Sequence, residues 1–289
     1  MSKPGRLGIG IVSAGRVGAV LGYALRAAEH QVVGVHAVSE ESRDRAENLL
    51  PGAPILEIPE ILRRAELVLL AVPDDQLGPL VQGLADGGHW RTGQLVVHTA
   101  GRYGIGVLEP ARAAGAIPLA IHPAMTFTGL SMDLARLGDC VFGVTADNMM
   151  LPIAQALVVE MGAEPVVVAE DHRVRYHAAL AHASNHLVTI AGQAAQMLGA
   201  IGVERPDRVL APLMRASLEN ALASGESALT GPVARGDSGT VAEHAEALRA
   251  EDDDVRLAYQ AMARATALRA VDRGRITQEQ ADRILDLLD

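Results

Sequence analysis

Residues 7–18 constrain the fold of this chain more than any other segment. An apolar run, Leu-Gly-Ile-Gly-Ile-Val, leads into a turn of small residues, and a helical pattern of apolar residues follows. Glycines in such a strand–turn–helix unit permit close backbone approach, and the N–H groups at the helix start attract a pyrophosphate. The segment predicts a dinucleotide-binding unit whose turn contacts the cofactor through Ser13, Ala14, Gly15, Arg16, Val17 and Gly18.

One position of this turn departs from the usual glycine pattern. Ser13 stands where the first glycine of G-x-G-x-x-G is expected, and Gly8 and Gly10 lie inside the predicted strand, so neither can replace it. A glycine match alone is a weak signal. Its position after a strand and before a helix is what supports the prediction.

Composition limits the classes of protein and partner. A chain of 289 residues predicts about two domains, and 49% hydrophobic with 2% aromatic residues predicts cores of Ala, Val, Leu and Ile. The net charge of −10 disfavours nucleic acid as a partner. No run of about 20 apolar residues occurs, so we expect no membrane span.

Cysteine and lysine are each used once. Cys140 has no partner for an intramolecular disulfide, and Arg16 and several glycines interrupt the apolar stretch that could resemble a secretory signal. We therefore expect a cytoplasmic protein. Lys3 is the only lysine, which leaves almost no room for a mechanism with a buried catalytic lysine.

Two regions of different character follow one another, with the boundary near Ala169. Apolar strands alternate with helices in residues 1–169, which predicts an α/β fold with a doubly wound, parallel, Rossmann-type sheet. The predicted strands are residues 7–12, 31–38, 67–72, 95–98, 118–122, 140–145 and 165–169. The predicted helices between them are residues 17–28, 41–50, 77–84, 107–114 and 151–162.

Residues 170–289 carry no strand pattern and predict an all-α domain. Thr277 and Gln280 have the spacing of a capping box at the start of the last helix. The predicted helices are residues 171–198, 206–223, 240–250, 253–272 and 278–288.

Polar groups follow three central strands. In a parallel sheet these carboxyl ends meet beside the turn that follows the first strand, where ligands bind. Histidines at two equivalent strand ends favour a functional site over simple capping of strands. The residues expected there are Val72, Pro73 and Asp74 at the end of the third strand, His98 and Thr99 at the end of the fourth, and His122 at the end of the fifth.

The end of the second strand bears on the choice of cofactor. NAD sites usually place Asp or Glu there, whereas NADP sites use small or basic groups. Ser39 and Arg43 occupy this region, and Arg16 is a further candidate to reach a phosphate. We therefore expect NADP, while Glu40 and Glu41 keep NAD open as the alternative.

The first helix of the second region carries a polar stripe. His182, Asn185 and His186 share one face, and His177 lies in the adjacent arc. The i, i+4 histidines also have metal-ligand spacing, but no zincin glutamate or cysteine cluster accompanies them, so we predict no metal. The stripe belongs either to a domain interface or to a substrate and nicotinamide site.

A glycine-flanked loop at residues 230–237 is a second candidate. Arg235 there could bind a carboxylate bidentately, or could pair with Asp237 and hold the loop. Asn220 and Glu219 end a helix just before this loop and could support it.

These motifs together resemble a family that joins an N-terminal Rossmann-like NAD(P)-binding domain to a C-terminal helical domain of unknown function. The family is more distantly similar to 6-phosphogluconate and beta-hydroxyacid dehydrogenases, pyrroline-carboxylate reductases and ketopantoate reductases. Some members resemble alternative ketopantoate reductases of pantothenate biosynthesis. The matching segments, in chain order, are residues 13–18, 71–75, 98–101, 122–127, 176–179, 184–185, 218–220 and 230–237.

The resemblance includes one departure. In the beta-hydroxyacid dehydrogenases a lysine precedes an asparagine by one helical turn. Asn185 matches that asparagine, but Ala181 stands in place of the lysine. The role of the lysine therefore cannot be transferred to this chain.

The expected activity is NAD(P)H-dependent reduction of a small 2-oxo acid such as 2-dehydropantoate (ketopantoate). With lysine absent, histidine is the natural proton donor, first His122 and then His177. Asn185 would hold the carbonyl oxygen or the nicotinamide ribose, and Arg235 and Asn220 would bind the substrate. The alternatives are a non-catalytic dinucleotide-binding sensor or scaffold, and an imine reductase resembling pyrroline-carboxylate reductase. We expect a homodimer through the helical domain.

Overall fold

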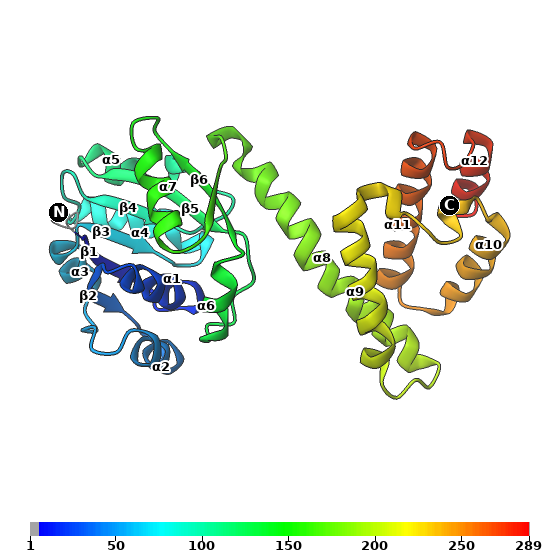
Figure 1. The fold of residues 1–289 in the computed structure, drawn as a ribbon, viewed down its shortest axis with the longest axis horizontal. Helices are drawn as coiled ribbons and strands as arrows, with labels where there is room; N and C mark the ends of the chain where they lie inside the picture. The colour runs from blue at the N-terminus through cyan, green and yellow to red at the C-terminus, as the bar shows by residue number, and fades with distance from the viewer. Residues whose placement is uncertain (1–5, 289) are drawn as a thin grey trace. The chain divides into compact units, whose positions relative to one another are not determined.

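The computed structural model describes residues 6–288 and divides into two compact units, Met1–Ala183 and Ser184–Asp289 (Figure 1). The last strand ends at Val167, close to the predicted boundary at Ala169. The division itself falls further along, inside the long helix α8 (Arg173–Ala200), which begins in the first unit and ends in the second.

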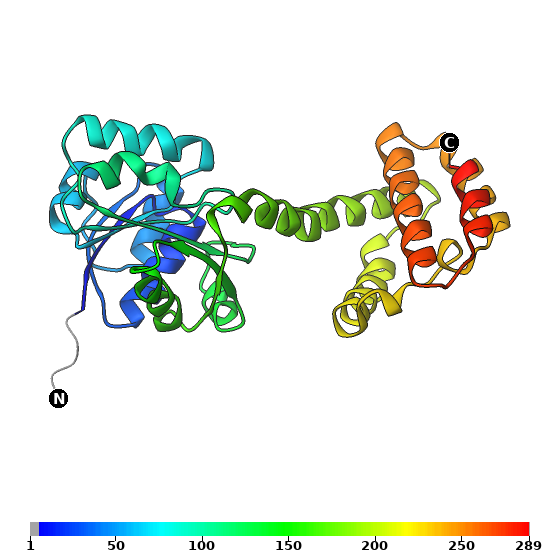
Figure 2. The same cartoon turned by 90° about the horizontal axis from the view of Figure 1, so that it is seen from above.

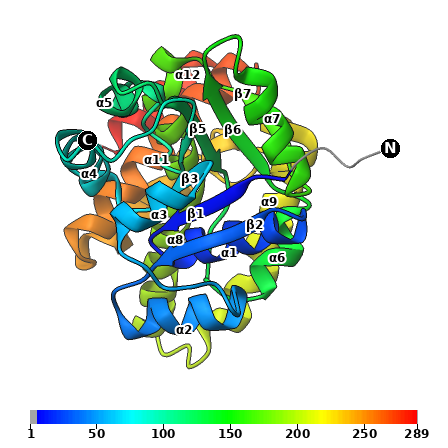
Figure 3. The same cartoon turned by 90° about the vertical axis from the view of Figure 1, so that its left-hand side faces the viewer.

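A seven-stranded sheet in the order β2-β1-β3-β4-β5-β6-β7 forms the centre of the first unit (Figure 3). The first five strands are parallel to one another, β6 is antiparallel to β5, and β7 is parallel to β6. Because β1 lies between β2 and β3, the chain leaves it in both directions, which is the switch point of a doubly wound sheet. The strands are β1 (Gly8–Val12), β2 (Gln31–His36), β3 (Leu67–Leu70), β4 (Leu95–His98), β5 (Ile117–Pro123), β6 (Val141–Ala146) and β7 (Glu164–Val167).

The sheet is therefore mixed, whereas the sequence predicted a parallel one. The connection between Pro123 and Val141 carries only the short helix α6 (Met132–Leu137), and the chain returns beside β5 in the opposite direction. Apolar runs look alike in either direction, so the pattern of residues could not show this reversal.

Helices cover both faces of the sheet (Figures 1 and 2). Successive strand residues point to opposite faces, so Leu67 and Leu69 join one apolar core and Val68 and Leu70 the other. The first core lies under α1 (Arg16–Ala27), α2 (Glu40–Leu49) and α7 (Leu151–Glu160). The second lies under α3 (Ile58–Arg64), α4 (Asp74–Asp86) and α5 (Glu109–Ala113), which follows a 3-10 turn, η1 (Ile105–Leu108).

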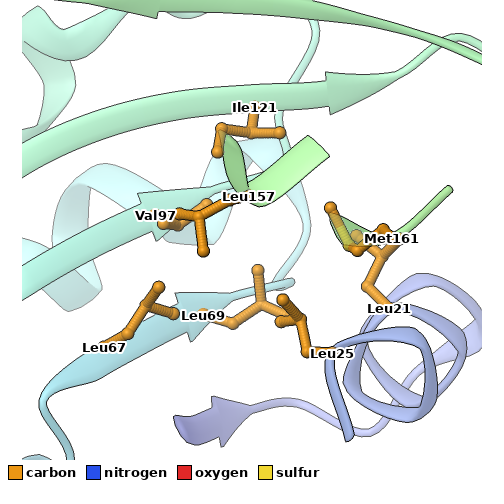
Figure 4. A pocket seen from close by; sticks show the side chains of 8 residues that line it. All are labelled: Leu21, Leu25, Leu67, Leu69, Val97, Ile121, Leu157 and Met161. Atoms are coloured by element: carbon orange, nitrogen blue, oxygen red, sulfur yellow. The ribbon is translucent and has the colours of Figure 1, made fainter. Parts of the chain in front are cut away.

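Aliphatic side chains fill the first core almost alone. Leu21 and Leu25 of α1 and Leu157 of α7 meet the strand residues Val97 and Ile121 around a small apolar gap (Figure 4). This packing agrees with the few aromatic residues in the composition.

The sequence did not predict α3 and α6. Both are short, seven and six residues, and α3 has Pro59 in its first turn. Proline is in fact well tolerated in the first turn of a helix.

The second unit is helical throughout its described residues. Its core is small and rich in alanine, with Ala267, Ala270 and Ile284 fully buried. Thr277 and Gln280 form the predicted capping box, which is thus confirmed. The remaining helices are α9 (Pro206–Ser224), α10 (Ser238–Ala247), α11 (Asp253–Asp272) and α12 (Gln278–Asp286).

Candidate functional site

The turn after β1 has the conformation that a glycine would normally supply. Ser13 has φ 78°, in the left-handed region that is uncommon for residues with a side chain. The N–H of Ala14 donates to His36 O (3.0 Å), which ties the turn to the end of β2. Gly15 is the N-cap of α1, and no side chain caps that helix end. The free N–H groups there are a ready site for an anion.

Gly18 shows why the turn requires a small residue in the helix. A Cβ at Gly18 would collide with the carbonyl oxygen of Ser13 and would lie 3.0 Å from Cβ of Ala71. The helix can therefore approach the strand ends closely only because Gly18 has no side chain.

A pocket of about 540 Å³ opens beside this turn, a size that suits a cofactor or part of one. The ends of β1, β2 and β3 form it. Six predicted cofactor residues line it: Ser13, Ala14, Gly15, Ser39, Val72 and Pro73. Its wall does not include seven others: Arg16, Val17, Gly18, Arg43, Asp74, His98 and Thr99.

Basic and hydroxyl groups at the start of α2 occupy the β2 end of the pocket. Ser39 caps α2 by accepting from the N–H of Ser42 (3.2 Å). Arg45 lines the pocket and Arg43 does not, since Arg43 Nε turns back to Ala37 O (3.5 Å). Sequence reasoning did not single out Arg45 as a pocket residue, although Ser42 and Arg45 have the i, i+3 spacing of one helix face.

His36 is a further pocket residue that the sequence did not single out. It is the last residue of β2, three positions before Ser39, on which the cofactor prediction rested. The position is near that of the acidic residue in NAD sites, and an imidazole stands there instead.

A loop between β5 and α6 packs against two arginines of this region. A Cβ at Gly129 (φ 81°) would lie 3.0 Å from Arg45 Cδ and 3.1 Å from Arg16 Cγ. The fully buried Asp133 holds this loop by accepting from the N–H groups of Thr128 and Gly129, both at 2.8 Å. Arg16 itself is exposed at the first turn of α1.

The two predicted residues after β3 and β4 have local partners. Asp74 begins α4 and pairs with Arg102 (Nε–Oδ2 3.3 Å). The N–H of Thr99 donates to Leu70 O (3.3 Å), and its side chain is half-buried. The two strand ends are thus held side by side.

His98 is fully buried, and both ring nitrogens have partners in the protein. Nδ1 accepts from the N–H of Ala100 (3.2 Å), so Nε2 carries the hydrogen and donates to Gly104 O (2.8 Å). Burial lowers the pKa of His98 to about 4, with smaller contributions from Arg173 and His122. Both nitrogens of His98 are therefore occupied, and neither is available to a ligand. The two hydrogen bonds instead hold the loop after β4 in place.

His122, Tyr176 and His177 come together at the end of β5. His122 Nδ1 lies 3.0 Å from Tyr176 Oη, and the rings of His122 and His177 are in edge contact at 6.0 Å. A Cβ at Gly101 would lie 2.9 Å from His122 Nε2 and 2.6 Å from His177 Cδ2. The structure thus brings the two predicted catalytic histidines together, beside the backbone that follows β4.

A buried arginine supports this cluster. Arg173 Nε donates to Thr145 Oγ1 (2.7 Å), and Nη2 donates to Ala120 O (2.9 Å) and Gly143 O (3.1 Å). Burial lowers the pKa of His122 to about 4, and the charges of Arg173 and His177 add to the effect. His122 is therefore neutral at neutral pH.

The other predicted site residues lie in the second unit. Asn185 is exposed on α8 and accepts from Ser184 Oγ (3.0 Å), and Asn220 is exposed on α9. Arg235 is exposed in a 3-10 turn, η4 (Val233–Arg235). Asp237 is the N-cap of α10 and accepts from the N–H of Thr240 (3.1 Å), so this carboxylate already has a structural partner.

Two further observations concern the described residues. Within residues 6–288, no three His, Cys, Asp or Glu side chains are grouped so as to hold a metal ion. No helix in the same part of the chain has the length and apolar character needed to cross a bilayer.

The strand order and the turn after β1 define the first unit as a Rossmann-type fold. Residues 1–123 match the family model of a Rossmann-like domain, and residues 140–266 match that of DUF2520, a domain of unknown function. The chain therefore belongs to the proteins that join these two domains, as its motifs indicated.

Solved structures share this fold over nearly the whole chain. A protein from Bacteroides fragilis, BF3122, provisionally named an NADP oxidoreductase, is 22% identical with a TM-score of 0.74, covering 91% of this chain and 98% of its own. TM1727 from Thermotoga maritima is 24% identical with a TM-score of 0.69, covering 92% and 100%.

A reductive aminase from Aspergillus terreus, solved with NADPH and ethyl levulinate, is 16% identical. Its TM-score is 0.68, and the match covers 97% of this chain and 99% of that one. No curated protein matches the chain in sequence.

Proposed function

We propose that this protein is an NADPH-dependent oxidoreductase that reduces a small 2-oxo acid, with 2-dehydropantoate as the first substrate to test. The observation that carries the proposal is the pocket at the ends of β1, β2 and β3, with His122 two strands away at the end of β5. Strand spacing puts the ends of β3 and β5 roughly 10 Å apart. A dinucleotide bound in the pocket could extend toward His122 over that distance.

The residues present fit NADP. The unpaired N–H groups at the start of α1 would receive the pyrophosphate, and Ser13 Oγ has no hydrogen-bond partner in the described part of the chain. Ser39, Ser42 and Arg45 would receive the 2′-phosphate, since they line the β2 end of the pocket. When bound, the nicotinamide supplies a hydride for the carbon of the substrate double bond.

Reduction of a carbonyl places negative charge on its oxygen, which the protein must stabilise. His122 and His177 are the groups proposed to do so, because they face Gly101 at the carboxyl edge of the sheet. Asn185 is proposed to hold the carbonyl oxygen or the nicotinamide ribose. Arg235 is proposed to bind the substrate carboxylate, with Asn220 supporting it.

An imine is the second candidate substrate. The neutral state of His122 favours it, because a protonated imine accepts a hydride without needing a proton donor. Three structures of similar fold have names that also support an imine substrate. They are an imine reductase from Pseudomonas sp., the reductive aminase from Aspergillus terreus, and a pyrroline-carboxylate reductase from Streptococcus pyogenes.

The proposed assembly is a homodimer through the helical unit. Helix α8 has 28 residues and buries only Arg173, and α9 buries none of its 19 residues. Long helices gain most of their stability in proteins from packing an apolar face. A second copy of the chain would supply the missing partner surface.

The deciding experiment follows NADPH oxidation with 2-dehydropantoate, other 2-oxo acids and cyclic imines, alongside calorimetric NADPH binding. Oxidation with one of these classes identifies the substrate class. Binding without oxidation across the whole panel would instead support a dinucleotide sensor. Arg235→Ala is expected to raise KM for acid substrates about tenfold while leaving NADPH binding unchanged; an unchanged KM would remove Arg235 from the site.

A further inference from the structure

The contact between His122 and Tyr176 carries an inference that rests on the proposed function. His122 Nδ1 and Tyr176 Oη are 3.0 Å apart, and their rings meet edge to face at 90° with centroids 5.6 Å apart. The hydrogen lies either on the phenol or on Nδ1, and this choice fixes what the other ring nitrogen offers to a ligand.

The β5–β6 pairing brings the neighbours of this contact to one face of the sheet. His122 pairs with Gly143, and Ala120 pairs with Thr145. Positions two apart on a strand share a face. Arg173 hydrogen-bonds Ala120, Gly143 and Thr145, so the first turn of α8 is fixed against the strand pair that carries His122.

The phenol of Tyr176 is held in a space that only glycine leaves open. A Cβ at Gly143 would lie 2.6 Å from Tyr176 Oη, which no real contact of this kind allows. The guanidinium carbon of Arg173 lies 5.8 Å from the Tyr176 ring centroid, within the range of a cation–π contact. The ring therefore has one defined position beside His122.

Donation from Tyr176 to His122 Nδ1 would pair a phenol, the stronger donor, with an imidazole nitrogen, the stronger acceptor. Burial raises the pKa of Tyr176, although the charge of Arg173 and the backbone of Gly143 oppose the effect, so the phenol keeps its proton at neutral pH. Nε2 of the neutral imidazole then carries the ring hydrogen.

His122 Nε2 faces the carboxyl edge of the sheet. It lies 2.9 Å from the place that a Cβ on Gly101 would take, next to the end of β4. Gly101 thus keeps the approach to this nitrogen free of a side chain. The proposed substrate double bond would lie on this edge.

We propose that Tyr176 is a positioning residue that holds His122 as its Nε2–H tautomer. His122 Nε2 thereby presents a fixed hydrogen-bond donor to the oxygen or nitrogen of the double bond to be reduced. The two residues polarise this bond by a preorganised dipole and not by transfer of the ring proton: a protonated imine needs no further proton after hydride addition, and the alkoxide formed from a carbonyl takes its proton from solvent water.

Nitrogen NMR of the full chain with isotopically labelled histidine tests the tautomer without any substrate. The signals of His122 are assigned by their loss in His122→Asn. We expect a protonated Nε2 and an unprotonated Nδ1 in the wild type, and a change at Nδ1 in Tyr176→Phe. A protonated Nδ1 in the wild type would overturn the proposal, whether or not the protein proves to be an enzyme.

The second unit contains a matched control. His244 Nδ1 lies 2.9 Å from Tyr259 Oη, also with rings at a steep angle, in a pair that has no place in the proposed site. Tyr259→Phe is expected to alter the nitrogen signals of His244 alone and to leave the kinetics unchanged.

Kinetics then test the effect on rate. Tyr176→Phe keeps the ring over Gly143, so we expect an unchanged circular dichroism spectrum, a roughly tenfold lower kcat and a KM within about twofold. An unchanged kcat with the NMR change present would remove the positioning role. If the wild type turns over no substrate, the proposed function fails, while the NMR result still decides the tautomer.

Discussion

The carbonyl oxygen of Ser13 occupies the space that a methyl group on Gly18 would need. The left-handed backbone of Ser13 and the missing side chain of Gly18 therefore act together: they allow the start of α1 to lie close to the strand ends. Ser13→Gly keeps the backbone and removes only the hydroxyl, so it isolates the contribution of Oγ.

We expect Ser13→Gly to weaken NADPH binding about tenfold by calorimetry, because a hydrogen bond to a charged group contributes about 1.5 kcal/mol or more. Gly18→Ala is expected to weaken binding further, since the turn itself must open. Equal affinity of Ser13→Gly and wild type would show that the hydroxyl does not touch the cofactor.

Arg45 and Arg43 offer a matched pair for cofactor selection, because one lines the pocket and the other turns away from it. Arg45→Gln is expected to weaken NADPH binding by about tenfold or more and to leave NADH binding unchanged, since only NADPH has a 2′-phosphate. Arg43→Gln is expected to affect both cofactors little. If Arg43→Gln weakened NADPH binding more than Arg45→Gln, Arg43 would be the residue that binds the 2′-phosphate.

Burial of His98 predicts a loss of stability in mild acid. The pKa of His98 falls from 6.5 to about 4 in the folded protein, so the unfolded chain binds more protons between these values. Stability due to this group is therefore fully present above about pH 6.5 and declines as the pH falls toward 4. Between pH 7 and pH 5 the expected loss from His98 is about 2 kcal/mol.

Urea unfolding at the two pH values measures this loss. His98→Asn can still accept from the Ala100 N–H but does not titrate in this range. It should be less stable than wild type at pH 7 and should lose about 2 kcal/mol less on acidification. An equal loss of unfolding free energy in wild type and His98→Asn between pH 7 and pH 5 would show that His98 does not cause the acid destabilisation.

The exposed leucines of α9 test the proposed homodimer. Leu213 and Leu222 are 61% and 80% exposed. An exposed apolar helix face is expected to be covered by a partner. Light scattering of the wild type should give the mass of a dimer, and the double variant Leu213→Glu, Leu222→Glu that of a monomer. Val159→Glu, on the exposed face of α7 in the first unit, should leave the dimer intact.

The sequence predicted the order of the strands and of the longer helices because periodicity and small-residue turns are local signals. Strand β4 and helix α11 have the predicted bounds, and the capping box at Thr277 formed as expected. Helix α3 was missed because its seven residues are too few for a clear helical period of apolar residues.

The site was harder to predict because its geometry depends on contacts between distant segments. No local pattern shows that Arg43 turns back to Ala37 while Arg45 lines the pocket. His98 was predicted at a functional strand end, but its partners, Ala100 and Gly104, arise from the path of the following loop. Tyr176 lies in the family motif at residues 176–179, but its position beside His122 depends on Gly143 of the antiparallel β6.

Trp90 is the single tryptophan of the chain, and it is buried in the second core of the first unit, where its indole N–H donates to Val81 O (3.1 Å). Its fluorescence therefore reports on the sheet-containing unit alone, whereas circular dichroism follows the helices of both. Comparing the two signals during one denaturant titration distinguishes a single cooperative transition from two, without any label. The protein thus carries its own optical probe of whether its two units unfold independently.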